Sequence, residues 1–288
     1  MQFDCRAARD TITPPRVRAS AMSCDCHIHI LGPYTRYPLS ERRAYTPPEA
    51  SLEDYARVQA ALGLERVVVV QPSVYSTDNR CTLDALAHFG IARSRGIAVV
   101  DPAIGAAELK AMHEGGIRGV RVNLVTAGGP PVEHLTQLAA KIAPLGWHTQ
   151  VYVDGAQLPT LAPVLQALPT EVVVDHMGQI PSAWGLDHPA VAALRSLLDG
   201  GRAWVKLCAY RSSSAGYPFH DADPLAKLLV ETTAERCVWG TDWPHPAFEG
   251  TTPDDGELLD AAMRWAPTPD LQRRLLVDNP AALYGFAP

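Results

Sequence analysis

The sequence has 288 residues, a formal net charge of −6, 47% hydrophobic residues and 19% charged residues. A chain of this size can bury one large α/β core or two smaller ones, and its composition is that of a soluble globular enzyme rather than a disordered chain. The negative charge argues against nucleic acid as a partner, and no run reaches the roughly 18 apolar residues of a membrane span.

The first 22 residues are predicted to form an extended tail in front of a single catalytic domain at residues 23–288. They are rich in arginine, contain proline and lack the apolar core of a secretory signal, so we expect a cytoplasmic protein. In that compartment the six scattered cysteines are expected to remain reduced thiols.

The stretch CDCHIHI, which begins at Cys24, is predicted to be the first strand of the domain because β-branched isoleucines recur in it. Successive side chains of a strand point to opposite faces. His27 and His29 are therefore expected to share one face with Asp25. Cys24 and Cys26 are expected on the other face, packed outward against helices.

Apolar runs typical of buried parallel strands recur along the whole domain, eight in all. They comprise residues 26–30, 66–73, 96–104, 117–125, 148–155, 170–178, 203–210 and 236–245. Helical patterns lie between and after them, at residues 51–62, 82–95, 188–201 and 279–286. Ser51 and Asp54 have the spacing of a capping box at the start of the first helix.

Eight alternating units predict an α/β fold, specifically a (β/α)₈ or TIM barrel. The alternative is an open doubly wound sheet with a cap. That arrangement is disfavoured because no GxGxxG-like loop follows the first strand.

Polar side chains recur at the C-terminal ends of seven of these strands, where barrel enzymes place their active sites. They are His27, His29, Gln71, Ser73, Arg121, Asn123, Tyr152, Asp154, Asp175, His176, Lys206, Arg211, Asp242 and His245. Asp242 lies in the apolar run VWGTDW, so its burial would be costly without a cation or donors, which three histidines could supply. Arg121 and Arg211 could instead be structural salt-bridge partners, and His176 alone could be a hydrogen-bonded core residue.

The remaining histidines are expected on helices or in loops, with packing or solvent roles. They are His88, His113, His134, His148, His188 and His220.

Three motifs carry a family resemblance: the HxH pair, DHMG at residues 175–178 and GTDWPHP at residues 240–246. Together they resemble the amidohydrolase superfamily, in particular its 2-pyrone-4,6-dicarboxylate lactonase-like branch, over about residues 23–286. The resemblance implies that the catalytic residues are His27, His29, His176 and Asp242. It implies substrate contacts from Tyr45, Ser73, Arg121, Tyr152 and Arg211, with His245 as a further pocket candidate.

One position departs from that branch. Where the lactonase has a second arginine shortly after the fourth strand, the segment NLVTAGG carries Ala127 and no arginine. The clamp for a dicarboxylate is therefore incomplete, which leaves a monocarboxylated or differently substituted lactone as the alternative substrate.

The resemblance implies a lactone hydrolase of aromatic compound catabolism that binds a small carboxylated lactone. Asp242 would act as the general base that activates water, and His27, His29 and His176 would polarise the carbonyl. It also implies catalysis without a metal. We expect a monomer or homodimer.

Other functions stay open at this point. A single Zn²⁺ bound by His27, His29 and Asp242 would instead indicate a decarboxylase or amide hydrolase of the same superfamily. A sugar-lactone isomerase would use the same carbonyl activation. A non-catalytic binding barrel is disfavoured because a mere binder has little need of a base beside carbonyl donors.

Overall fold

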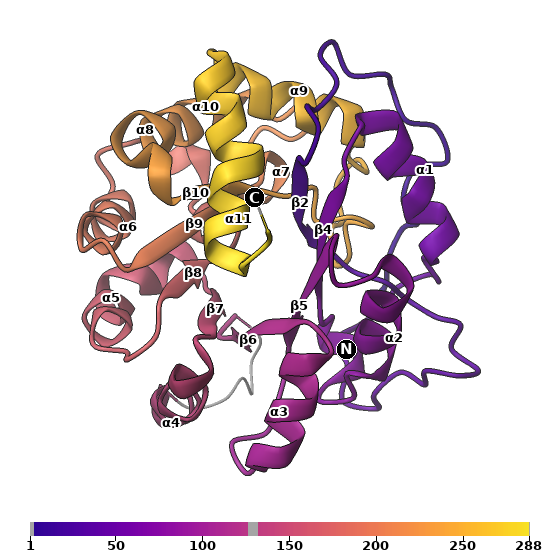
Figure 1. The fold of residues 1–288 in the computed structure, drawn as a ribbon. Coiled ribbons are helices and arrows are strands. Elements are labelled where there is room, and N and C mark those ends of the chain that lie inside the picture. The colour runs from indigo at the N-terminus through magenta and orange to yellow at the C-terminus, as the bar shows by residue number, and fades with distance from the viewer. Residues whose placement is uncertain (1–2, 126–131, 288) are drawn as a thin grey trace.

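A computed structural model describes residues 3–125 and 132–287. Eight strands form one parallel sheet in chain order, and Figure 1 shows them arranged around a common axis. They are β2 (Cys24–Ile28), β4 (Arg66–Val70), β5 (Ser94–Ala98), β6 (Ile117–Asn123), β7 (His148–Tyr152), β8 (Val172–Val174), β9 (Ala203–Leu207) and β10 (Cys237–Trp239). A separate pair, β1 (Phe3–Asp4) and β3 (Tyr45–Thr46), lies outside this sheet.

The sheet closes through residues that follow its last strand. Asp242 N donates to His27 O at 2.9 Å, and His29 N donates to Trp243 O at 2.8 Å. Ile28 and Trp243 form a parallel bridge between these two bonds. The predicted (β/α)₈ barrel is thus confirmed and the open doubly wound sheet is wrong. The closure also places the HxH strand directly beside Asp242.

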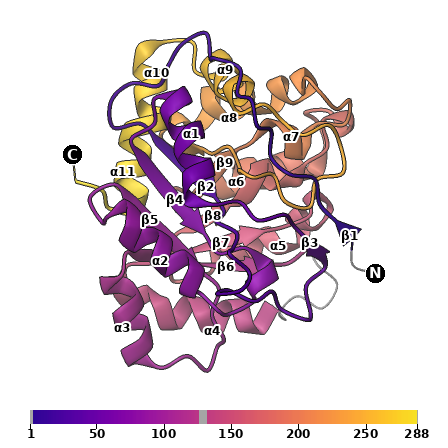
Figure 2. The ribbon, with the colours of Figure 1, turned by 90° about the vertical axis from the view of Figure 1, so that its right-hand side faces the viewer.

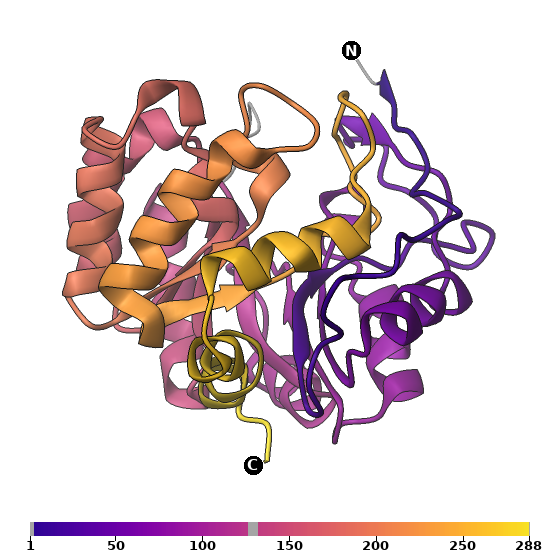
Figure 3. The ribbon, with the colours of Figure 1, turned by 90° about the horizontal axis from the view of Figure 1, so that it is seen from above.

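Most helices surround the strands on the outside, whereas the last one, yellow in Figure 1, lies across one end of the barrel (Figures 1 and 3). The helices are α1 (Leu52–Leu62), α2 (Arg80–Phe89), α3 (Ala106–Glu114), α4 (Val132–Ile142), α5 (Leu158–Gln166), α6 (Pro189–Asp199), α7 (Ala209–Ser212), α8 (Asp223–Thr233), α9 (Asp255–Trp265), α10 (Pro269–Arg273) and α11 (Asn279–Tyr284). A π-helical turn, Arg274–Asp278, joins the last two. No helix within residues 3–125 and 132–287 is both long enough and apolar enough to cross a membrane.

Two helix predictions had different outcomes. The capping box of α1 is confirmed, because Asp54 N donates to Ser51 Oγ at 3.1 Å and Ser51 N donates to Asp54 Oδ2 at 2.9 Å. The helix predicted to run to residue 95 instead ends at Phe89. Gly90 has a φ of 79°, a conformation that glycine adopts without strain, so the chain turns there and enters β5 four residues later.

The outward position predicted for the cysteines of the first strand is wrong. Cys24 and Cys26 belong to the small apolar cluster of the barrel interior, together with Val68, Ile97 and Tyr284. The pairing of β2 with β4 shifts register between residues 25 and 28, as an extra residue in a strand causes. This irregularity breaks the alternation of faces that the sequence reading assumed, and all six cysteine thiols are free.

Asp25 and His148 also lie elsewhere than expected. Asp25 points toward the helices, where it accepts a hydrogen bond from Tyr55 Oη of α1 at 3.3 Å. His148 lies not on a helix or loop but at the start of β7, buried, with its ring 5.4 Å from that of Tyr284. Burial, and then the charge of Lys206, lowers the pKa of His148 to about 3, so this ring is neutral at neutral pH.

The N-terminal segment contains β1 and then no helix or strand up to residue 23. It crosses the outside of the barrel next to α9 (Figures 2 and 3). Thr13 Oγ1 donates to Asp254 Oδ2 at 2.8 Å, and Arg16 N donates to Asp260 Oδ1 at 2.8 Å. The segment is therefore attached along its length to the element that follows the last barrel strand.

Candidate active site

The two histidines of the HxH pair reach the C-terminal mouth of the barrel together. His27 Nε2 lies 3.5 Å and His29 Nε2 lies 3.3 Å from Asp242 Oδ1. The ring centroids of the pair are 5.0 Å apart with an edge-on geometry. The structure thus brings residues more than 200 positions apart in the sequence to one carboxylate oxygen.

His176 joins them from a tight turn, Asp175–Gln179, at the end of β8. Its φ of 52° lies in the left-handed region, which costs a non-glycine residue about 1–3 kcal/mol and is concentrated at functional sites. The turn places His176 Nε2 3.6 Å from Asp242 Oδ2 and its ring 4.6 Å from that of His27. Burial lowers the pKa of His176 to about 4, so the ring is neutral at neutral pH.

Asp242 also has left-handed backbone geometry, with a φ of 60°. Its Oδ2 accepts hydrogen bonds from Tyr210 Oη at 2.6 Å and from Arg211 Nε at 2.8 Å. Burial by itself would raise the pKa of this carboxyl, but the Arg211 charge and the surrounding histidines outweigh it and hold the pKa well below its usual range. Oδ2 is therefore engaged, and Oδ1 is the oxygen that faces His27 and His29.

Tyr210 is a site residue that sequence reasoning missed. It immediately precedes Arg211, and the single turn of α7 brings both side chains to the same carboxylate. No motif marks the tyrosine, because the predicted strand end at residue 210 would have placed two consecutive residues on opposite faces.

The hydrogen bond at the other nitrogen of His29 defines its tautomer. His29 Nδ1 lies 2.7 Å from Val70 O, and a carbonyl oxygen can accept only, so Nδ1 carries the proton. In the neutral ring Nε2 then has a lone pair directed at Asp242 Oδ1. Two acceptors in such proximity call for a proton, a water molecule or a cation between them.

The same atoms could hold a metal ion. His27, His29 and Asp242 each offer a ligand atom within 4.8 Å of the others. His27 Nε2 is buried without a hydrogen-bond partner among the residues that the structure describes. Two nitrogens and a carboxylate oxygen suit a single Zn²⁺ with an open position. Overlapping groups, His27–Asp175–His176 and His176–Cys208–Asp242, share these residues.

A buried charged network lies beneath the histidines and centres on Asp175. Its Oδ2 accepts from Arg121 Nε at 2.9 Å and from Gln150 Nε2 at 3.1 Å. Its Oδ1 lies 3.5 Å from His27 Nδ1 and 3.7 Å from Lys206 Nζ. Burial raises the pKa of Asp175, but Arg121 and Lys206 outweigh it and keep the pKa well below its usual range. An ionised Asp175 thus holds Arg121 by a hydrogen bond and lies beside His27, whose Nδ1 is also 3.5 Å from Lys206 Nζ.

A cavity of about 250 Å³ opens above Asp242. The residues that line it are Phe3, His29, Ala44, Tyr45, Ser73, Arg121, Asn123, Val125, Tyr152, His176, Arg211, Asp242, Pro246 and Ala247. The five substrate contacts implied by the resemblance are all among them, and Ser73 Oγ donates to Tyr45 Oη at 3.2 Å. Ala127, the position of the missing arginine, lies outside the described residues.

The sequence left open whether the two arginines contact the substrate or form structural salt bridges, and their positions are compatible with both roles. Arg121 and Arg211 each form a salt bridge through Nε, to Asp175 and Asp242 respectively, and each also lines the cavity. Arg211 Nη2 also donates to Pro246 O at 2.6 Å. Both guanidinium groups are thus held in place at the cavity, where they would pair with an anion.

Like His27, His245 does not line this cavity, although the resemblance implies both residues. It is buried behind Asp242, with its Nε2 3.2 Å from Asp255 Oδ1 and its ring 5.3 Å from that of Tyr210. His245 N donates to Asp242 O at 2.7 Å. It therefore supports the turn that carries Asp242, and its contact with a ligand stays a prediction.

Comparison with known proteins identifies the family of this chain. The sequence profile of a family described as amidohydrolase matches residues 24–286. The chain is 39% identical over 282 residues to a 2-pyrone-4,6-dicarboxylate hydrolase of Comamonas testosteroni, covering 94% of this chain and 92% of that one. It is 35% identical over 292 residues to a 4-sulfomuconolactone hydrolase of Hydrogenophaga intermedia, covering 98% and 94%.

A solved structure agrees with this relationship. It is that of a probable 2-pyrone-4,6-dicarboxylic acid hydrolase from Acinetobacter baumannii with citric acid bound. Its TM-score is 0.83 at 26% identity, and the match covers 92% of this chain and all (100%) of that one.

Proposed function

Because this chain belongs to the amidohydrolase family, we propose that it is a hydrolase that opens a small carboxylated lactone ring. The observation that supports this most strongly is one cavity that contains both a carboxylate surrounded by three imidazoles and two fixed arginines. The carboxylate and the imidazoles suit chemistry at a carbonyl group, and the arginines suit binding of an anionic substrate. Two relatives named for lactone hydrolysis support the same reaction.

The proposed reaction begins with attack of water on the lactone carbonyl. Asp242 Oδ1 takes a proton from the water as its oxygen bonds to the carbonyl carbon. The bond to the ring oxygen then breaks, and the proton passes from Asp242 to that oxygen as it leaves as a hydroxyl group. The products are a carboxylic acid, which ionises, and an alcohol or enol, so one water is consumed and no other reactant is needed.

The three imidazoles would have different tasks. His27 and His176 would donate through Nε2 to the carbonyl oxygen as negative charge develops on it. His29 carries a proton on Nδ1 toward Val70 O, and its Nε2 would orient the attacking water beside Asp242. This assignment refines the expectation that all three histidines polarise the carbonyl.

Substrate binding would also adjust the base. In the free protein the Arg211 charge contributes to the low pKa of Asp242, which makes this carboxylate a weak base. A substrate carboxylate paired with Arg211 would partly neutralise that charge and raise the basicity of Asp242. The strongest base would then form when the substrate is in place.

A zinc-dependent decarboxylase or amide hydrolase is the second candidate, favoured by the lone pair of His29 Nε2 and the unpartnered His27 Nε2 in the described part of the chain. His27, His29 and Asp242 would hold the ion. When bound, a Zn²⁺ there would supply Lewis-acid activation of a carbonyl or of water.

The test is a screen of pyrone carboxylates, muconolactones and aldarolactones by proton release, each with and without a chelator, followed by product analysis. We expect ring-opened acids that form at the same rate with chelator. An isomerised lactone would indicate an isomerase, and turnover of amides or carboxylic acids that requires stoichiometric zinc would favour the second candidate.

A further inference from the structure

The N-terminal segment contributes a side chain to the active-site cavity. Phe3 is among the lining residues, and its ring centroid lies 6.2 Å from that of Tyr45. Phe3 is 37% exposed. Its position at the rim makes it accessible to a ligand.

The backbone around Phe3 is fixed on two sides. β1 pairs with β3 in parallel register, Phe3 opposite Tyr45, and Cys5 N donates to Thr46 O at 2.9 Å. On the other side Ala247 N donates to Cys5 Sγ at 3.3 Å. The segment thus links the loop that carries Tyr45 to the turn that follows Asp242.

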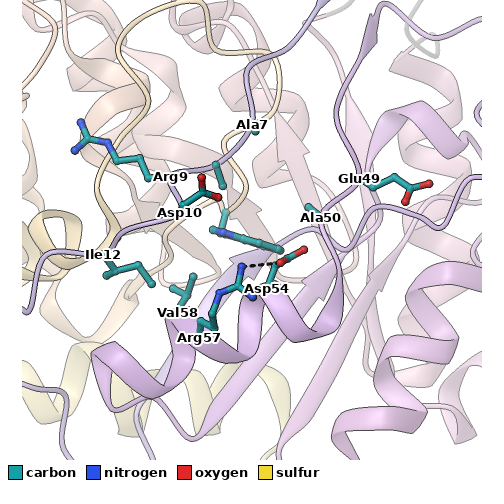
Figure 4. Close-up of a pocket in the computed structure, with 11 residues that line it drawn as sticks. Ala7, Arg9, Asp10, Ile12, Glu49, Ala50, Asp54, Arg57 and Val58 are labelled. Carbon is teal, nitrogen blue, oxygen red and sulfur yellow. Dashed lines mark hydrogen bonds and ion pairs between the residues drawn. The ribbon is translucent and has the colours of Figure 1, made fainter.

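The next part of the segment is seated beside the catalytic turn as well. In Figure 4 Asp10 and Ile12 lie beside α1 around a cavity of about 110 Å³, which Trp243 also lines, whereas the Arg9 side chain points away from α1. Arg9 Nε donates to Thr252 O at 2.8 Å, so the segment is bound to the loop on the far side too. These contacts make the position of Phe3 a defined part of the barrel mouth.

The described lining of the active-site cavity contains two kinds of residue. The polar residues are His29, Tyr45, Ser73, Arg121, Asn123, Tyr152, His176, Arg211 and Asp242. The apolar residues are Phe3, Ala44, Val125, Pro246 and Ala247. A ligand complementary to both kinds is anionic where it meets Arg121 and Arg211 and apolar where it meets Phe3.

We propose that Phe3 is a specificity-determining residue, which contacts an apolar substituent on the lactone at the end opposite the arginine-bound carboxylate. This inference rests on the proposed function and narrows its substrate class to monocarboxylated lactones with an alkyl or aryl group. Related enzymes named for substrates with a second acidic group, a carboxylate or a sulfonate, present a chemical contrast.

The test compares three substrates that differ only at one ring position: 2-pyrone-6-carboxylate and its 4-propyl and 4-carboxylate derivatives. The wild type is expected to prefer the propyl compound. Phe3→Ala should lower kcat/KM for that compound about ten-fold, through KM, and should lower it less for the unsubstituted parent, since one apolar contact is typically worth 10-fold or more. Phe3→Arg should raise kcat/KM for the dicarboxylate relative to the propyl compound. A misfolded variant would not show such a gain.

Trp184→Ala is the matched control, because Trp184 has the same 37% exposure but does not line the cavity. It should leave all three rates unchanged. If Phe3→Ala alters the three substrates equally or not at all, or Phe3→Arg does not favour the dicarboxylate, the role of Phe3 is refuted while lactone hydrolysis stands. If the wild type opens no lactone of this set or the wider screen, the proposed function fails first.

Discussion

Arg211 Nε lies 2.8 Å from Asp242 Oδ2, and Arg211 also lines the substrate cavity. One guanidinium therefore connects the proposed base with the proposed anion site. This arrangement couples binding to catalysis, because any anion that pairs with Arg211 changes the charge that Asp242 experiences.

The most direct prediction concerns Asp242 as the general base. Asp242→Asn keeps the size of the side chain but cannot accept a proton, so we expect turnover to fall at least about 10²–10⁴-fold, the usual contribution of a general base. Circular dichroism and thermal unfolding should show an intact fold. Activity within a few-fold of the wild type would remove Asp242 from this role.

Replacing the coupled arginine should move the pH profile. In Arg211→Met the positive charge that contributes to the low pKa of Asp242 is lost, so that pKa rises. Asp242 would then become protonated at a higher pH, and the acid limb of the kcat/KM profile should move upward. KM should rise as well, because an anion contact is lost. A fall in rate with an unmoved acid limb would separate Arg211 from the base.

The network beneath the site predicts a large stability effect. Asp175→Asn leaves Lys206 buried near an uncharged group, and such uncompensated charges typically cost about 3–5 kcal/mol of unfolding free energy. Urea denaturation at pH 7 measures it, and the double variant Asp175→Asn/Lys206→Met should recover part of the loss. The exposed pair Arg273–Asp278 provides the control, with an expected change below about 1 kcal/mol for Asp278→Asn.

Two buried histidines predict acid sensitivity. Burial lowers the pKa of His148 to about 3 and that of His176 to about 4, both below the value of about 6.5 in an unfolded chain. Their contribution to stability is therefore complete above pH 6.5 and is lost as pH falls toward 4, because the unfolded state binds protons first. Each contributes up to about 1.4 kcal/mol per pH unit in this range.

Urea denaturation at a series of pH values tests whether these two histidines cause the acid sensitivity. His148→Gln should weaken the dependence between pH 6.5 and 4, while His88→Gln, an exposed helix position, should not. An unchanged slope in His148→Gln would assign acid unfolding to other groups.

Zinc content and the effect of a chelator on kcat decide whether the enzyme needs a metal. We expect dialysis against a chelator to leave kcat unchanged, and purified protein to contain well under one zinc per chain. His29→Gln should then reduce kcat in the same proportion with or without added zinc. Loss of activity on chelation, restored by one equivalent of Zn²⁺, would instead establish a metal enzyme bound through His27, His29 and Asp242.

Much of this protein was determined by local sequence patterns. Near-continuous apolar runs specify parallel strands buried on both faces, and their alternation with helices specifies the barrel. The polar residues that end these runs, such as Arg121, His176 and Asp242, meet at one mouth because the C-terminal ends of parallel strands must point the same way.

Other features depend on contacts between distant segments, which periodicity does not encode. The register shift in β2 arises from pairing with β4, and it turned Cys24 and Cys26 inward against the expectation from simple alternation. Tyr210 reached Asp242 through the geometry of a single helical turn. Phe3 entered the cavity because a segment read as a plain tail pairs with β3 over 40 residues later. Local alternation fixes which way a side chain leaves its own strand, whereas tertiary pairing decides what it meets.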